Sequence, residues 1–144
     1  MVNSHGSNLK RITLSIQERM VRDVIHSMLR AHDFDVQDIA PCVQPNETAD
    51  CMLECYPDQE RPDLMILDVM VDRACTGVEV AQKALQQFPS VKILLTSATP
   101  PLVWPDSARL LFDTLRGNSC AFLSKPFTAQ QLHTAIAALL DGAE

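Results

Sequence analysis

The stretch PDLMILDVM, residues 62–70, decides the fold of this chain. Its centre, Leu-Met-Ile-Leu at 64–67, is continuously apolar rather than alternating, and Asp68 ends the run. Continuous apolarity indicates a strand buried on both faces, as in parallel sheets that helices cover on both sides. The stretch therefore predicts an α/β protein, with Asp68 at the carboxyl end of a central strand.

Short strands alternate with amphipathic helices along the rest of the chain. The expected strands cover residues 9–15, 34–40, 64–67, 91–95 and 120–123. The expected helices cover 18–31, a segment from Asn46 or Thr48 to about Tyr56, 77–88, 106–115, and a final segment that begins after a cap at Thr128. This alternation predicts a flavodoxin-like (βα)5 fold, a doubly wound parallel sheet in the strand order 2-1-3-4-5.

The composition fits one domain without a nucleic-acid or membrane surface. A chain of 144 residues has the size of a single domain, here residues 9–144 after a flexible lead-in at 1–8. The formal net charge is −6 and no basic run occurs, which argues against nucleic-acid binding. No apolar stretch approaches the roughly 20 residues of a membrane span, and residues 1–8 lack the apolar core of a signal peptide. We therefore expect a cytoplasmic protein.

The cysteines leave two interpretations open. Their number, five, is odd, and no CxxC pair occurs. Cys51 and Cys55 are four residues apart, so a helix would place them on one face, where a redox or metal role is one interpretation. Small buried side chains in a reducing cytosol are the favoured interpretation.

Polar side chains follow three of the expected strands at the same end. Asp68 ends the third, Thr96 and Ser97 end the fourth, and Ser124 and Lys125 end the fifth. Taken alone, an Asp after a strand is commonly a turn residue, and a Lys before proline is commonly just exposed. Taken together, a carboxylate, hydroxyls and an ammonium converge where open parallel sheets place their ligands. A carboxylate can accept a phosphoryl group, and the hydroxyl and ammonium could hold the phosphate oxygens.

Four stretches resemble the receiver domains of two-component response regulators. They are PDLMILDVM at 62–70, TGVEVAQKAL at 76–85, ILLTSA at 93–98 and AFLSKPF at 121–127. The resemblance implies that Asp68 is the phosphoacceptor, that Thr96 hydrogen-bonds the phosphoryl group and that Lys125 ion-pairs with it. It also implies that Phe122 is the family's aromatic switch residue; a plain core aromatic is the alternative for this position.

The chain departs from the receiver pattern at the metal site. Ile16 and Gln17 occupy the positions of the acidic pair that binds Mg²⁺ in the family, so Asp68 and the backbone carbonyl of Met70 would be the ligands that remain. Mg²⁺ prefers hard oxygen ligands, and Ile16 offers none, so we expect weak or absent Mg²⁺ binding. Glu18 and Asp72 are alternative ligands from new directions. The turn after Asp68 is also unusual, because residues 71–75 replace the family's Pro-Gly step and add one position.

Three functions follow from these observations. The favoured one is a non-enzymatic receiver phosphorylated at Asp68 by a histidine kinase or a phosphotransfer protein. The second is a degenerate receiver that binds proteins without a phosphate cycle. The third, a small flavodoxin-like enzyme or cofactor carrier, is disfavoured because no glycine-rich loop follows the first strand and the chain has only four glycines.

The proline-rich segment 100–105 is the expected partner surface, for a homodimer mate or another signalling protein. Prolines stiffen the segment, and Trp104 exposed on it would be an anchor for such a partner. The alternative is that Trp104 folds back over the core. The chain stops soon after the last expected helix, so it is either a stand-alone regulator or a piece of a longer protein.

Overall fold

A computed structural model describes residues 10–30, 32, 34–38, 62–70, 76–117 and 119–141. Several sequence-based expectations lie outside these residues: the lead-in at 1–8, the helix ending near Tyr56, the pair Cys51 and Cys55, and the turn at 71–75 with Asp72.

The described elements follow the predicted alternation of strands and helices. In chain order they are β1 (Lys10–Ser15), α2 (Arg19–Arg30), β2 (Phe34–Asp38), β3 (Leu64–Asp68), α4 (Thr76–Gln87), β4 (Lys92–Ser97), the 3-10 turn η2 (Pro101–Val103), α5 (Asp106–Leu115), β5 (Cys120–Ser124) and α6 (Ala129–Asp141). All strand pairs are parallel, in the order β2-β1-β3-β4-β5. The predicted strand order is therefore confirmed.

Strand β4 continues two residues beyond its expected end at 95, and the reason lies in its pairing with β5. Thr96 pairs with Leu123 and Ser97 with Ser124, so the ladder continues until β5 ends. The end at 95 was placed where the apolar run stops, but backbone pairing keeps the two hydroxyl residues in the strand. The extension places the hydroxyl of Thr96 level with Asp68 in the sheet.

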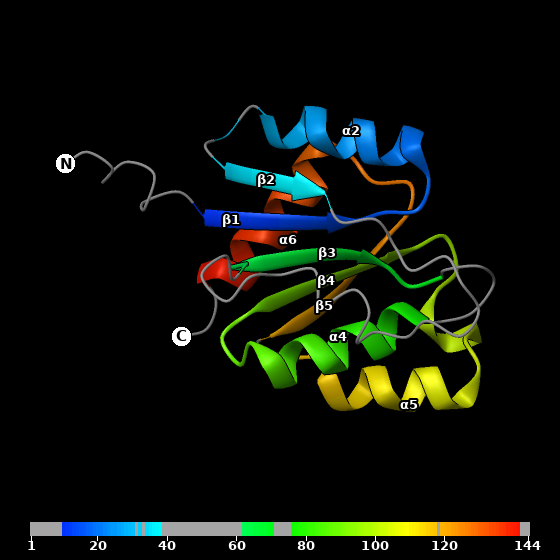
Figure 1. The fold of residues 1–144 in the computed structure, drawn as a ribbon. Coiled ribbons are helices and arrows are strands. Elements are labelled where there is room, and N and C mark those ends of the chain that lie inside the picture. The colour runs from blue at the N-terminus through cyan, green and yellow to red at the C-terminus, as the bar shows by residue number, and fades with distance from the viewer. Residues whose placement is uncertain are drawn as a thin grey trace.

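The sheet is covered on both faces, which explains the apolar run at 64–67. Helices α2 and α6 lie on one face and α4 and α5 on the other (Figure 1). Every residue of β3 is buried. Among the helices that the structure describes, none has both the length and the apolar character needed to cross a membrane.

The cap that the sequence predicted at Thr128 is present in the structure. The backbone N–H of Gln131 donates to the Thr128 hydroxyl at 3.0 Å, and the Thr128 N–H donates to the Gln131 side chain at 2.9 Å. This reciprocal pair is a capping box that starts α6. Arg116 caps the C-terminus of α5, and Gly117 follows with a φ of 144°, which favours glycine.

Cys120 is buried, and burial raises the pKa of its thiol to about 12, as expected for a structural cysteine.

Trp104 is buried, so the expectation of an exposed anchor was wrong. Its side chain is 5% exposed, and its indole N–H donates to the carbonyl oxygen of Thr99 at 3.0 Å. The ring packs edge-on against Phe112 and Phe122, with centroid distances of 5.6 and 5.5 Å. The η2 turn brings the ring back over the core, where its large apolar area is removed from water.

Candidate functional site

The candidate site lies where β3, β4 and β1 end. Asp68 is the last residue of β3, and its neighbour across the sheet is Thr96 of β4. Its side chain is 5% exposed, although a carboxylate normally stays in water unless it has partners. The partners of the two carboxylate oxygens therefore decide what this site can do.

One oxygen of Asp68, Oδ1, contacts both residues that the sequence placed beside it. The Lys125 ammonium donates to Oδ1 at 2.8 Å, and the Thr96 hydroxyl lies 3.1 Å from the same atom. The hydroxyl is also 3.3 Å from the Leu67 carbonyl oxygen. The predicted convergence of Asp68, Thr96 and Lys125 is thus present in the structure.

The other oxygen, Oδ2, accepts a hydrogen bond from the backbone of Gln17. The Gln17 N–H lies 2.8 Å from it. Residue 17 thus reaches Asp68 through its main chain, whereas the family uses a side-chain carboxylate near this position. Ile16, the other acidic-pair position, is fully buried with the core between α2, α6 and the sheet.

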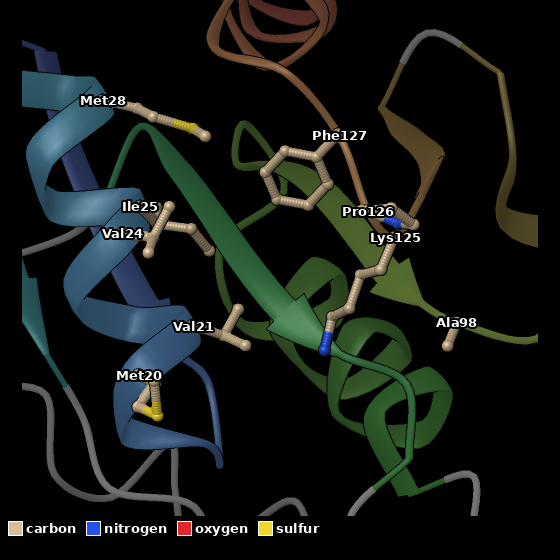
Figure 2. Close-up of a pocket in the computed structure, with 9 residues that line it drawn as sticks. All are labelled: Met20, Val21, Val24, Ile25, Met28, Ala98, Lys125, Pro126 and Phe127. Carbon is tan, nitrogen blue, oxygen red and sulfur yellow. The ribbon is translucent and has the colours of Figure 1, made fainter.

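Lys125 reaches Asp68 from the loop between β5 and α6. Its backbone N–H donates to the Ser97 carbonyl oxygen at 3.0 Å, and its peptide bond to Pro126 is cis. Its side chain extends to the carboxyl end of β3 (Figure 2) and is 19% exposed. A partly exposed lysine side chain thus pairs with a nearly buried carboxylate.

Gly77 is a site residue that the sequence interpretation missed. Its N–H donates to the Val69 carbonyl oxygen at 2.9 Å, which holds the start of α4 against the end of β3. A Cβ at this position would overlap the Asp68 carbonyl oxygen and lie 2.8 Å from the Val69 Cα. Only glycine fits this close backbone approach, so Gly77 sets how near α4 comes to Asp68. Spacing alone could not reveal this, because the approach depends on how the helix packs.

Phe122 occupies the position that the resemblance assigns to the aromatic switch. It is partly buried on β5 and forms an edge-on cluster with Trp104 and Phe112, at 5.5 and 6.4 Å between centroids. The cluster connects β5 with α5 and with the loop after β4. Its geometry fits both a switch residue and a core aromatic.

The side chains at this end of the sheet do not fit the Mg²⁺ site that the resemblance to receiver domains implies. Ile16 is aliphatic and buried, Gln17 offers a neutral amide, and Glu18 is exposed one place later in the chain. Within the described ranges, no three Asp, Glu, His or Cys side chains are grouped as a metal would need. Met70 follows Asp68 by two residues and is 37% exposed, but one backbone carbonyl and one carboxylate are a poor ligand set for Mg²⁺.

An apolar pocket of about 380 Å³ adjoins Lys125 (Figure 2). It lies between α2 and the segment that leads from β5 into α6, and it is lined by Met20, Val21, Val24, Ile25, Met28, Ala98, Lys125, Pro126 and Phe127. Met20 is 81% exposed and Val24 is 51% exposed, although both belong to the apolar face that the sequence predicted for this helix. The apolar face of α2 extends beyond the part that packs on the sheet. Its outer edge is therefore exposed, and the helical period of the sequence could not separate these exposed residues from the buried ones.

The comparisons with known proteins agree with this fold. The sequence matches no protein-family model. It is 27% identical over 84 residues to the uncharacterized transcriptional regulatory protein YxjL of Bacillus subtilis (strain 168). That match covers 58% of this chain and 35% of the relative, so the chain spans about a third of the relative's length.

Solved structures of receiver domains resemble the chain over nearly its whole length. The CheY-like response regulator receiver domain protein of Methanospirillum hungatei JF-1 superposes with a TM-score of 0.71 at 20% identity, covering 93% of this chain and 95% of that one. The response regulator receiver protein of Sinorhizobium medicae WSM419 gives a TM-score of 0.69 at 22% identity, covering 94% and 98%. At these identities the likeness establishes the fold: the chain has the CheY-like, flavodoxin-like architecture.

Proposed function

We propose that this chain is a receiver module of two-component signalling and that Asp68 accepts a phosphoryl group from a histidine kinase or a phosphotransfer protein. The observation that carries the proposal is the convergence of Lys125 and Thr96 on one oxygen of a nearly buried carboxylate. The fold and the similarity to a transcriptional regulatory protein support the same class. In this role the chain is a signalling module rather than an enzyme, acting in the cytoplasm.

The chemistry requires only groups that the site contains and a phosphodonor. A carboxylate oxygen of Asp68 attacks the phosphorus of a phosphohistidine, and the phosphorus–nitrogen bond breaks. The electron pair returns to the imidazole, which takes up a proton, and Asp68 becomes an acyl phosphate. The Lys125 ammonium and the Thr96 hydroxyl then donate hydrogen bonds to the new phosphoryl oxygens instead of to the carboxylate. Loose phosphoryl transfer depends mainly on such positioning and on charge neutralisation.

The phosphodonor protein would dock over the apolar pocket beside Lys125. Met20 and Val24 are exposed on α2 one helical turn apart, and the pocket that they border reaches Lys125. A helix of the donor covering these side chains would bring a phosphohistidine to the same end of the sheet as Asp68. The pocket is therefore the surface on which we place this partner.

The test is incubation of the protein with phosphoramidate or acetyl phosphate, followed by intact-protein mass spectrometry. We expect one added phosphoryl group that is labile in base, absent from Asp68→Asn and formed much more slowly in Lys125→Ala. Thr96→Ser keeps the hydroxyl and serves as the conservative control. Phosphorylation of Asp68→Asn to the same extent as wild type would show that another residue accepts the group.

A second function is protein binding without phosphorylation, and the hydrogen bonds that already occupy the Asp68 carboxylate favour it. Both carboxylate oxygens already have partners, and the acidic-pair positions hold Ile16 and Gln17. If neither small phosphodonors nor a panel of histidine kinases labels the protein, this degenerate receiver becomes the better description.

A further inference from the structure

We infer that Arg22 is a positioning residue for Asp68, acting through the peptide group that joins Ile16 to Gln17. Its positive charge polarises this peptide group toward the Asp68 carboxylate, at the place where receivers otherwise bind a metal. The inference rests on the proposed function, because it concerns the same carboxylate. It starts from the mismatch between the side chains at this end of the sheet and a Mg²⁺ site.

The geometry links three groups in a row. The Arg22 guanidinium nitrogen Nη1 donates to the Ile16 carbonyl oxygen at 3.3 Å. The Gln17 N–H donates to Asp68 Oδ2 at 2.8 Å. That carbonyl and that N–H belong to one planar peptide group, so Arg22 and Asp68 hold its opposite ends.

Such an arrangement strengthens the contact with the carboxylate. Hydrogen bonds in series polarise one another, particularly away from bulk water. The guanidinium stays charged at any physiological pH, so its pull on the Ile16 carbonyl oxygen is permanent. The Gln17 N–H thereby becomes a better donor toward Asp68 Oδ2, while Lys125 acts on Oδ1 from the other side.

The charge at the site explains why a second positive pole is needed. The Asp68 carboxylate and Lys125 balance each other. Phosphorylation replaces the single carboxylate charge with a phosphoryl group that carries roughly one and a half to two negative charges, so Lys125 alone no longer balances the site. Ile16 and Gln17 bring no charged side chain that could hold a cation there. The Arg22 guanidinium brings a positive charge that acts on the Asp68 carboxylate through the Ile16–Gln17 peptide group.

Helix α2 holds Arg22 in place for this contact. The Arg22 backbone N–H donates to the Glu18 carbonyl oxygen at 2.9 Å, which fixes it in the first turn directly after Gln17. Arg22 is partly buried, whereas Arg19 and Arg30 on the same helix are exposed. Arg30 lies at the opposite end of α2 and provides a matched control.

The first experiment reads the contact without any phosphate chemistry. The amide proton of Gln17 is followed by NMR in wild type, Arg22→Gln, Arg22→Lys and Arg30→Gln. We expect Arg22→Gln to shift this resonance upfield and to speed its exchange with solvent, Arg22→Lys to restore most of the shift, and Arg30→Gln to change neither. An unmoved Gln17 amide in a folded Arg22→Gln protein would overturn the inference.

The second experiment measures the rate of Asp68 phosphorylation by phosphoramidate, in EDTA and in Mg²⁺. We expect Arg22→Gln to slow the reaction about tenfold, because a hydrogen bond from a charged donor is lost. Arg22→Lys should restore part of the rate, and Arg30→Gln should react at the wild-type rate. EDTA should leave the wild-type rate unchanged. A reaction that EDTA abolishes, or an Arg22→Gln variant with the wild-type rate, contradicts the inference.

The two experiments separate this inference from the proposed function. If no variant is phosphorylated but the Gln17 amide responds to Arg22→Gln, the phosphoacceptor role fails and the contact through the peptide stands. If Asp68 is phosphorylated and the Gln17 amide does not respond, the phosphoacceptor role stands and the role of Arg22 fails.

Discussion

Gly77 shows how a single residue fixes the distance between an element and the site. Its N–H bonds to the Val69 carbonyl oxygen, and a Cβ would overlap the Asp68 carbonyl oxygen. The clash is with backbone, which cannot rotate away as a side chain could. The start of α4 must therefore move outward if any side chain is placed at this position.

We accordingly predict that Gly77→Ala lowers the free energy of unfolding by at least about 2 kcal/mol, in spite of the higher helix propensity of alanine. Urea unfolding followed by circular dichroism measures this. Glu79→Ala, an exposed change in the same helix, should stay within about 0.5 kcal/mol of wild type. An equally stable Gly77→Ala protein would mean that α4 adapts more easily than the backbone contact implies.

The residues of the site differ in how visible they are in the sequence. Asp68, Thr96 and Lys125 could be predicted because each lies at or just after the end of an apolar run, and parallel strands bring those ends together. The Gln17 contact could not be predicted, because a backbone N–H carries no sequence signature. Arg22 was missed for the same reason: its acceptor is a main-chain carbonyl oxygen.

At the scale of elements, the sequence predicted the strands and helices but not the outer surface of the helices. The period of α2 identified its apolar residues, yet Ile25 is fully buried and Met20 is 81% exposed. A helical period gives the direction of a side chain, whereas burial depends on how far the sheet and α6 extend beneath it. The same limit applies to Trp104, whose environment depends on the path of the η2 turn.

Because Trp104 is part of the core, its replacement should cost stability. We predict that Trp104→Ala lowers the free energy of unfolding by about 3 to 5 kcal/mol, from loss of a buried aromatic and of its contacts with Phe112 and Phe122. Trp104→Phe, which loses only the hydrogen bond to Thr99 and part of the ring, should cost less. Leu102, two residues before Trp104, is 78% exposed, so Leu102→Asp should leave the free energy of unfolding nearly unchanged. Urea unfolding of the three variants decides whether the ring stabilises the core.

The exposed edge of α2 leads to a prediction about partners. Met20→Asp combined with Val24→Asp should leave the fold and the rate with phosphoramidate unchanged, because both side chains are largely in water and neither contacts Asp68. Transfer from a phosphorylated histidine kinase or phosphotransfer protein should fall by about tenfold or more, since apolar contact is lost and charge is added.

The control for this surface is on the opposite side of the sheet. Leu110 of α5 is 60% exposed, and Leu110→Asp removes a similar apolar side chain far from the pocket. Equal losses of transfer in the α2 double variant and in Leu110→Asp would contradict docking at the pocket. Loss only in the α2 variant would support it.

At the scale of the whole molecule, the site joins segments that the chain keeps far apart. Asp68 comes from β3, Lys125 follows β5, and the Gln17 N–H follows β1, so three strand ends must be in register before the contacts form. The sequence predicted this meeting because strand order and direction follow from the alternation of elements. The altered turn at 71–75 and the helix expected to end near Tyr56 lie outside the described residues and stay predictions.

The pairing of Asp68 with Lys125 should therefore stabilise the entire sheet, and its burial decides by how much. The two side chains are 5% and 19% exposed, with 2.8 Å between the charged atoms. Arg109 and Asp106 form a pair at the same 2.8 Å, but their side chains are 36% and 85% exposed. The two pairs have the same length but differ in how much solvent screens them. They also differ in connectivity, because Lys125 and Asp68 are 57 residues apart whereas Asp106 and Arg109 are three apart in α5.

We predict from this comparison that a double-mutant cycle of Asp68→Asn and Lys125→Met gives a coupling free energy of about 2 kcal/mol in urea unfolding. Lys125→Met alone should be the most harmful change, because it leaves a nearly buried carboxylate without its cation while Thr96 and the Gln17 N–H still donate to it. Adding Asp68→Asn should recover much of that loss. The cycle of Asp106→Asn and Arg109→Met should give about 0.5 kcal/mol or less, as exposed pairs do. Equal coupling in the two cycles would mean that water reaches Asp68 freely, and the site would then lack the low-dielectric surroundings on which its charge balance depends.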